Sequence, residues 1–204
     1  MDRFRQIDDL LVGEQLNEIQ LFFQNQVLWK FGWQSDRDRT PFGHWNHDFL
    51  KTRRTNQADY EHVLRDGADL APLNDLWLRL KSEHLPEHTL VRCYANAHTF
   101  GVEGYPHSDS RKPGNHTVVI YLNPTWRADW AGETVFFNDA GDIFQAVLPK
   151  PGRTAQDLQG QRSSGGTSSI TRLGAQKNDA FNSSQAGCMA NARGRCAQPG
   201  VVRE

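Results

Sequence analysis

The chain has 204 residues and a nearly balanced charge, with 23 Lys and Arg against 24 Asp and Glu. This length favours one main domain, and the net charge of −1 gives no electrostatic reason to expect binding to nucleic acid or to a membrane surface. Residues 1–6 are too charged for a secretory signal, and no apolar run approaches the ~20 residues that a membrane helix needs. A cytoplasmic location is therefore the expectation.

Three helices are predicted before the middle of the chain, over residues 12–30, 56–65 and 70–81. In the last of these, Leu73, Leu76 and Leu80 recur at helical spacing, and Trp77 extends the same apolar side. This pattern indicates a helix that packs against a sheet.

The segment 31–49, between the first two helices, is rich in Trp, His and Phe. We expect it to form a loop that covers the sheet or frames a substrate pocket. The closely spaced His44 and His47 suggest a metal site only weakly, and a structural role is favoured. The three cysteines, Cys93, Cys188 and Cys196, form neither a disulfide framework nor a four-ligand zinc set, so isolated thiols are expected.

Four β-strands are predicted in the next part of the chain. Each is a run of β-branched, aromatic and other apolar residues near Gly, Pro, Asn or Asp, and the runs cover residues 90–97, 116–122, 132–137 and 142–148. Short strands at such spacings are typical of an antiparallel sandwich or barrel.

The run Tyr105-Pro106-His107-Ser108-Asp109 carries the most specific chemical signal. In an extended segment the side chains of His107 and Asp109 leave the same face and converge. Iron(II) oxygenases bind their metal through two histidines and one carboxylate, so this run supplies two of the three ligands. An isolated H-x-D triplet is a weak signal, but this one lies among predicted strands.

The motifs around the triplet resemble those of the iron(II)- and 2-oxoglutarate-dependent oxygenases, in particular the prolyl 4-hydroxylase-like branch. They match in order and spacing over residues 90–153, and the N-terminal half matches more loosely. The matching segments are Arg92-x-Tyr94-x-Asn96, Gly104 to Asp109, Val119 to Trp126, Trp130 to Thr134 and Leu148 to Arg153.

The resemblance implies an α+β fold in which a helical part, residues 1–89, packs outside a double-stranded β-helix of jelly-roll or cupin type, residues 90–153. It further implies that this enzyme would hydroxylate a C–H bond of a peptidyl prolyl or small-molecule substrate, with Fe(2+), 2-oxoglutarate as co-substrate and L-ascorbate as an accessory reductant.

The same resemblance implies roles for five residues: His107 and Asp109 as iron ligands, and Tyr94, Thr117 and Tyr121 as residues that line the 2-oxoglutarate pocket. Hydroxyl groups suit this second role because they can donate hydrogen bonds to a buried carboxylate. Without this context, a tyrosine or threonine on a strand is more often a packing residue.

Residues 154–204 have a different composition from the rest of the chain. They contain no histidine and one aromatic residue, and their six Lys and Arg against three Asp and Glu give +3, which leaves −4 for residues 1–153. Such a segment buries little apolar surface and is expected to be largely disordered. We therefore predict an oxygenase domain over residues 1–153 that lacks its C-terminal strands, followed by an anomalous tail.

The tail leaves two parts of the implied site without a residue: the second histidine ligand, and a basic residue that would pair with the far carboxylate of 2-oxoglutarate. Its abrupt start after Arg153 suggests a shifted reading frame. Codon degeneracy agrees, because moving the frame of residues 157–161 by one base allows the Phe-x-Gly step expected just before the missing histidine. A natural divergent tail is the alternative.

Two other functions stay open. A non-catalytic β-core that serves as a binding or scaffold module would agree with the missing histidine. A cupin-type metal hydrolase or isomerase would need a third ligand beside His107 and Asp109, for example His98 or His116. If the chain is an oxygenase, we expect its activity to be impaired, because a site with two protein ligands binds iron(II) poorly. Neither the substrate nor the oligomeric state follows from the sequence.

Overall fold

The computed structural model describes residues 4–34, 38, 43–50, 60–99, 102, 104–109, 114–158, 163–165 and 171–176. The α-helices of this part are α1 (Gly13–Asn25), α2 (Glu61–Asp66) and α3 (Ala71–His84), and two short 3-10 helices cover Ala68–Leu70 and Ala128–Trp130. None of the described helices is both long and apolar enough to cross a membrane.

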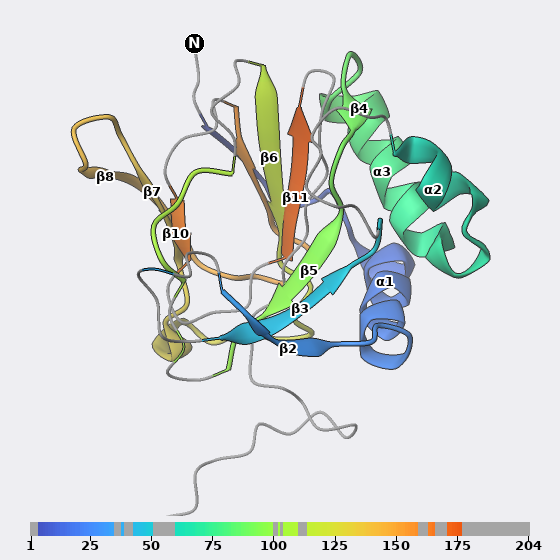
Figure 1. Cartoon of the computed structure of the whole chain (residues 1–204), viewed down its shortest axis with the longest axis horizontal. Helices are drawn as coiled ribbons and strands as arrows, with labels where there is room; N and C mark the ends of the chain where they lie inside the picture. The colour runs from blue at the N-terminus through green and yellow to red at the C-terminus, as the bar shows by residue number, and fades with distance from the viewer. Residues whose placement is uncertain are drawn as a thin grey trace, which may run out of the picture.

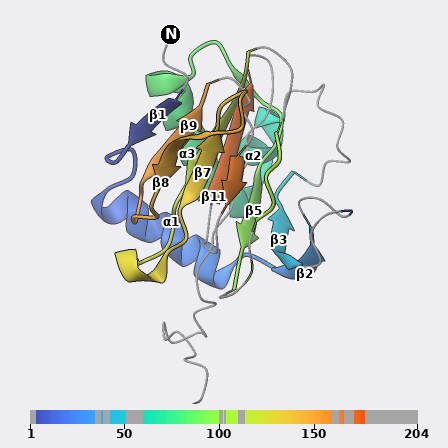
Figure 2. The ribbon, with the colours of Figure 1, turned by 90° about the vertical axis from the view of Figure 1, so that its left-hand side faces the viewer.

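The strands form three antiparallel sheets (Figure 1). The largest has the order β1 (Phe4–Ile7), β9 (Thr154–Asp157), β6 (Asn115–Ile120), β11 (Thr171–Gln176) and β4 (Thr89–Leu90). The second has the order β10 (Ser163–Gly165), β7 (Thr134–Phe137) and β8 (Ile143–Val147), and the third β2 (Lys30–Trp33), β3 (His44–Asp48) and β5 (Tyr94–Ala97). Figures 1 and 2 show the helices on one side of the largest sheet and the β7–β8 hairpin on the other.

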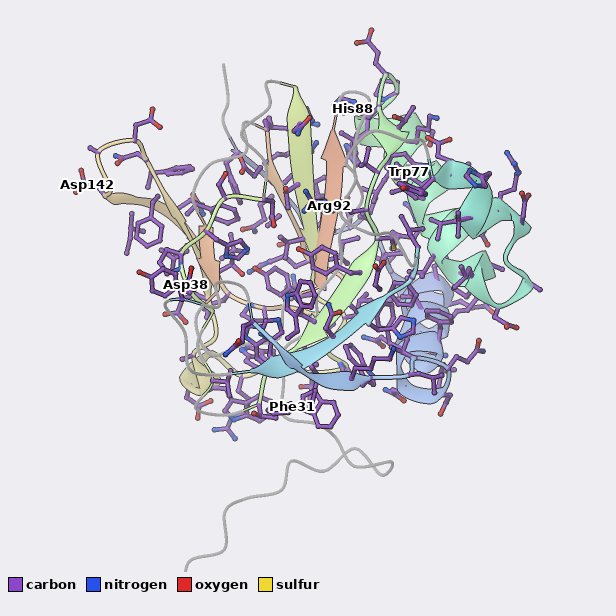
Figure 3. The ribbon with its side chains drawn as sticks, viewed as in Figure 1. Phe31, Asp38, Trp77, His88, Arg92 and Asp142 are labelled. Atoms are coloured by element: carbon purple, nitrogen blue, oxygen red, sulfur yellow. The ribbon has the colours of Figure 1, made fainter. Side chains whose placement is uncertain are left out.

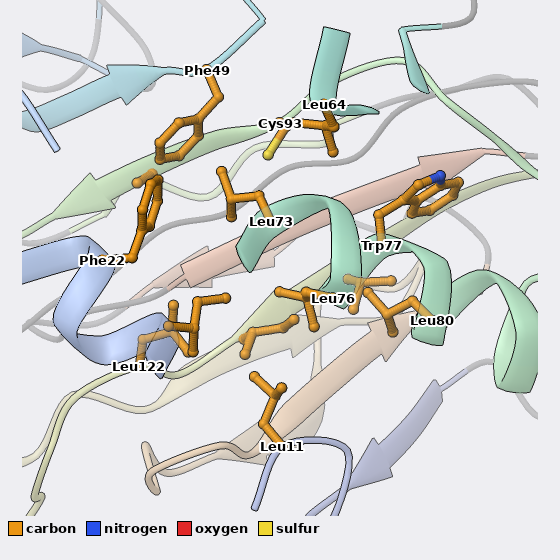
Figure 4. Close-up of a cluster of buried hydrophobic side chains, with 14 of the residues drawn as sticks. Leu11, Phe22, Phe49, Leu64, Leu73, Leu76, Trp77, Leu80, Cys93 and Leu122 are labelled. Atoms are coloured by element: carbon orange, nitrogen blue, oxygen red, sulfur yellow. The ribbon is translucent and has the colours of Figure 1, made fainter. Parts of the chain in front are cut away.

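The main hydrophobic core lies between the helices and the largest sheet. Its α3 residues, Leu73, Leu76, Trp77 and Leu80, are each at most 2% exposed, which confirms the packing predicted from their spacing. Figure 4 shows these side chains in one cluster with Phe22 of α1, Phe49 and Leu122. Burial of each large apolar side chain contributes roughly 1.5–3 kcal/mol before entropy is counted.

Alternation along β6 divides the molecule into two layers. Val118 and Ile120 belong to the core beneath the helices, whereas Val119 and Tyr121 belong to a second cluster with Phe136 and residues of β8 and β9. Because side chains alternate between the two faces of a strand, the face of β6 that carries Thr117, Val119 and Tyr121 is turned away from the helices.

The predicted elements are mostly present, with shifted ends. The first helix stops at Asn25, well before residue 30, because the chain then enters β2. The second begins at Glu61, while residues 56–59 lie outside the described part. The strand predicted over 90–97 is two strands, β4 and β5, with residues 91–93 between them.

The expectation of a loop over residues 31–49 is wrong for β2 and β3. Strand β3 pairs with β5 from Trp45↔Ala97 to Asp48↔Tyr94, and Phe31 of β2 packs on Trp45 with ring centroids 5.2 Å apart. The segment His-Trp-Asn-His-Asp lacks the alternation of apolar and polar residues that identifies a strand from sequence. Pairing with distant β5 therefore decides its conformation.

The expectation that the C-terminal strands are missing is also wrong. Strand β9 lies between β1 and β6 with all four residues buried, and β11 lies between β6 and β4. The physical reason is that a sheet satisfies backbone N–H and C=O groups whatever the side chains are. The disorder predicted for the tail stays a prediction for residues 159–162, 166–170 and 177–204, which lie outside the described residues.

Candidate metal centre

His107 and Asp109 converge as their spacing predicts. Nε2 of His107 lies 3.5 Å from Oδ1 of Asp109, and their side chains are 23% and 11% exposed. Nδ1 of His107 lies 2.7 Å from the carbonyl oxygen of Tyr105. A carbonyl only accepts hydrogen bonds, so it favours the tautomer in which Nδ1 carries the proton.

In that tautomer Nε2 of His107 is an acceptor, and it lies 3.5 Å from a carboxylate oxygen of Asp109. Two acceptors this close repel each other unless a proton or a cation lies between them. Metal-binding histidines commonly donate their other ring N–H to a carbonyl or carboxylate, which fixes the ring. The donor set of one imidazole and one carboxylate suits a transition metal such as iron(II), and so the two residues fit two of the three protein positions of such a centre.

Two residues contact Asp109: Tyr94, the first residue of β5, and Arg92, which precedes that strand. The hydroxyl of Tyr94 donates to Oδ1 of Asp109 at 3.4 Å, and Nη2 of Arg92 donates to the backbone carbonyl of Asp109 at 3.4 Å. Figure 3 shows Arg92 near the centre of the molecule. Tyr94, one of the three residues expected to line the 2-oxoglutarate pocket, thus contacts a candidate ligand.

Thr117 and Tyr121 share the face of β6 that is turned away from the helices. Thr117 is buried. Tyr121 is fully buried, and its hydroxyl donates to Oγ1 of Thr134 at 2.8 Å. This hydrogen bond fits a packing residue with a satisfied hydroxyl, and a 2-oxoglutarate carboxylate would have to compete with Thr134 for it. The role of both residues in co-substrate binding stays a prediction.

A third ligand is not found in the described part of the chain, where no three His, Cys, Asp or Glu side chains gather around one point. The two histidines that could complete a cupin-type centre contact other histidines instead. His98 packs on His44 with ring centroids 4.4 Å apart, and His116 packs on His88 at 4.3 Å.

His44 and His47 also do not form a metal pair. They are three residues apart on β3 and therefore face opposite sides of the strand. The ring of His47 packs on Phe49, and its Nδ1 lies 2.8 Å from the carbonyl oxygen of Leu28.

Cys93, next to Tyr94, is a free and buried thiol. Burial is the main cause that raises its pKa well above the ordinary value, and the negative charge of Asp48 adds to the effect. The thiol is therefore neutral near pH 7 and is a poor nucleophile.

Two charged residues of the C-terminal strands pair with β6 at positions that the sequence did not suggest. Asp157 of β9 stands opposite Thr117 of β6 and is 5% exposed. Arg172 of β11 stands opposite Val119. Residues opposite each other in an antiparallel pair belong to the same face of the sheet, so Asp157 belongs to the face of Thr117 and Tyr121. No sequence signal identifies either residue, because both lie in the tail that was expected to be disordered.

No model of a protein family and no curated protein matches this sequence. Solved structures do match. A prolyl-4-hydroxylase from Pseudomonas putida superimposes with a TM-score of 0.54 at 15% identity over 85% of this chain and 89% of that chain. An oxidoreductase of the 2OG-Fe(II) oxygenase family from Burkholderia pseudomallei gives 0.58 at 13% identity over 88% of each. The chain has the fold of the 2OG-Fe(II) oxygenases. At such identities the likeness concerns the fold, and function has to be argued from the site.

Proposed function

We propose that this chain is an iron(II)- and 2-oxoglutarate-dependent dioxygenase in which His107 and Asp109 hold the metal. The observation that carries the proposal is their convergence at 3.5 Å on an oxygenase fold. Bound iron(II) and 2-oxoglutarate would supply the oxidising chemistry for hydroxylating a C–H bond of a peptidyl prolyl or small-molecule substrate. L-ascorbate would serve as an accessory reductant, and the strands would close as a double-stranded β-helix.

In this proposal the chain's own residues bind and orient. The carbonyl of Tyr105 holds the ring of His107, and the hydroxyl of Tyr94 holds Asp109. Tyr94, Thr117 and Tyr121 line the 2-oxoglutarate pocket, and Arg172 is our candidate for the basic residue that pairs with the far carboxylate. A guanidinium suits that role because its planar fork bonds both carboxylate oxygens.

The activity is proposed to be impaired, because no histidine follows His116 in the sequence and a two-residue site holds iron(II) weakly. The same observation favours a second candidate function. A non-catalytic module would keep the β-core for binding a partner and would not need the third ligand.

Anaerobic titration with iron(II) and 2-oxoglutarate tests the proposal through the metal-to-ligand absorption band that forms when both occupy one centre. We expect a weak band that is lost in His107→Ala and Asp109→Ala. The matched control variants are His62→Ala and Asp69→Ala, which alter exposed residues on the helical side and should keep the band.

Absence of a band in the unmodified chain at millimolar iron(II) would contradict the dioxygenase proposal for these 204 residues. If the band is present, oxygen-dependent formation of succinate separates the two candidate functions. A dioxygenase forms succinate from 2-oxoglutarate, whereas a scaffold module does not, even where it binds a metal ion.

A further inference from the structure

Strand β8 is an apolar edge strand. In the described part of the chain it pairs only with β7, at the end of the β10–β7–β8 sheet, and Figure 1 shows this hairpin projecting from the body of the molecule. Ile143, Phe144 and Leu148 are 61%, 38% and 38% exposed. Residues 143–148 contain no charged residue and no proline, the residues that commonly protect an edge strand from pairing with another chain.

The exposed side chains along this edge form a row with opposite charges at its two ends. From Phe144 to Lys150 every second residue is exposed, and the residues between them are less exposed or buried. The row begins with an acidic residue at the tip of the hairpin (Figure 3), continues with three apolar residues and ends with a basic residue. Its members, which we call the β8 row, are Asp142, Phe144, Ala146, Leu148 and Lys150.

The β8 row is complementary to itself when a second copy is read in the opposite direction. A two-fold axis at Ala146 pairs two β8 strands antiparallel, with each Ala146 opposite the other. The same register sets Phe144 opposite Leu148 and Asp142 opposite Lys150, because each residue lies as many positions before Ala146 as its partner lies after it. Every such pair occurs twice in a symmetric dimer. Apolar pairs and opposite charges across two antiparallel strands both stabilise the pairing.

The contacts that the β8 row makes within its own chain are easily exchanged. The carbonyl oxygen of Ala146 accepts a hydrogen bond from Nε2 of its neighbour Gln145 at 3.1 Å, at an exposed position. The backbone N–H of another strand can replace this side-chain amide. Lys150 is 57% exposed, and its Nζ lies 3.8 Å from the carboxylate of Asp8. An exposed ion pair of that length contributes little, so Lys150 can turn to a partner chain at small cost.

A bulge in β8 limits how far the pairing extends. The β7–β8 register shifts at Phe144, which has no residue opposite it on β7. A bulge bends the strand and interrupts regular pairing, so the ladder between two copies runs from Phe144 to Leu148 and no further. A contact of this size is small, and it is typical of a weak and reversible dimer.

We propose that two copies of this chain form a symmetric dimer by antiparallel pairing of their β8 strands. The charges at the ends of the β8 row select the orientation, because parallel strands in register would set Asp142 against Asp142 and Lys150 against Lys150. The net charge of −1 adds little repulsion between the copies. The inference is independent of the proposed function, since no residue of the β8 row belongs to the candidate metal centre.

Sedimentation equilibrium of the purified full chain, without iron or 2-oxoglutarate, tests the dimer. We expect a reversible equilibrium between monomer and dimer, with a dissociation constant on the order of 10–100 μM for so small an interface. A chain that stays monomeric up to about 1 mM, a hundredfold to tenfold above that range, would overturn the inference. This measurement needs no variant, so it decides the matter even where a substitution disturbs folding.

Two charge reversals test the register. Asp142→Lys and Lys150→Asp each set like charges opposite each other at both ends of the β8 row, and each should weaken dimerisation about tenfold. The double variant with both changes pairs opposite charges again and should restore the dimer. The control is Asp75→Lys, which makes the same charge change at an exposed residue of α3 and should leave the dissociation constant unchanged. A double variant that stays as weak as the single ones, or an equal effect of Asp75→Lys, would contradict the proposed pairing.

Discussion

The hydroxyl of Tyr94 donates a hydrogen bond to Oδ1 of Asp109, at 3.4 Å, from a different segment of the chain. It joins strand β5 to the segment that carries both candidate iron ligands. Partners of this kind orient a metal-binding carboxylate, and their loss typically lowers metal affinity by 10–100-fold.

We expect Tyr94→Phe to weaken iron(II) binding by about three- to tenfold, below that range because the hydrogen bond is long. Anaerobic metal titration of the purified variant measures the effect. Tyr60→Phe is the matched control, because Tyr60 lies at the start of α2, away from the candidate ligands. Equal affinity in Tyr94→Phe and the unmodified chain would show that the hydroxyl does not position Asp109.

Arg172→Gln should weaken binding of 2-oxoglutarate by about tenfold if Arg172 pairs with the far carboxylate, since a hydrogen bond between charged groups contributes roughly 1.5–3 kcal/mol. The absorption band at increasing 2-oxoglutarate concentration gives the affinity. Arg79→Gln is the control, because Arg79 lies on α3 and bonds Glu83. An unchanged affinity in Arg172→Gln would remove Arg172 from the proposed site.

Asp8 and Arg153 tie the end of β1 to the start of β9. Nε and Nη2 of Arg153 donate to the two carboxylate oxygens of Asp8 at 2.7 and 3.0 Å. The hydrogen bond from Arg153 is the main cause that lowers the pKa of Asp8 below its ordinary value of 3.8. Because the folded-state pKa is lowered, the pair stabilises the fold above the unfolded-state pKa, and the contribution is lost as the pH falls through the folded-state value.

We expect Asp8→Asn to destabilise the protein at pH 7 by about 1 kcal/mol, the upper part of the range for exposed pairs, since the Asp8 side chain is 38% exposed. Urea unfolding at several pH values checks this, and the two proteins should approach equal stability below pH ~4. Asp129→Asn, which removes the exposed pair with Arg127, should leave the stability unchanged. A difference between Asp8→Asn and the unmodified chain that persists undiminished at pH 3 would contradict the ion-pair explanation.

Gly152 lies in the turn before β9, close to Leu11 in the segment before α1. Its φ is +76°, and a Cβ atom there would clash with the backbone carbonyl oxygen of Leu11. Gly152→Ala therefore combines backbone strain with a clash against backbone, and we expect a loss of about 2–4 kcal/mol. Gly141 has a φ of +89° but open space around it, so Gly141→Ala should cost only about 1 kcal/mol. Thermal unfolding of both variants checks the difference, and equal losses would show that the close approach to Leu11 does not matter.

Gln156 puts an amide into the core beneath the helices. It stands opposite Val118, which belongs to that core, it is 1% exposed, and neither of its side-chain polar atoms has a hydrogen bond within the described residues. Burying an unpaired amide costs roughly 1–3 kcal/mol in proteins. We expect Gln156→Leu to stabilise the protein by about this amount, seen as a higher urea midpoint with an unchanged slope.

Gln24→Leu, on the exposed side of α1, is the control for Gln156→Leu and should have little effect. A destabilised Gln156→Leu would mean that the amide has an essential role in the core. The shifted reading frame expected after Arg153 stays a hypothesis. Sequencing the coding DNA tests that hypothesis directly, and it fails if no other frame restores a strand with a histidine.

The elements best predicted from the sequence are those with a local signal. The spacing of Leu73, Leu76 and Leu80 predicts α3 because a helix repeats every 3.6 residues. The run of β-branched residues from Thr117 to Ile120 predicts β6, because such residues are enriched in strands. Strand β3 has no such signal, and its polar residues form a strand because β5 provides the backbone partners.

By itself, the sequence determined the pairing of His107 with Asp109, because two side chains separated by one residue in an extended segment must face the same side. Only the tertiary structure decided that Tyr94 contacts Asp109 and that β9 and β11 join the largest sheet. The physical reason is that strand pairing joins residues far apart in the chain, and composition carries no information about which strands become neighbours.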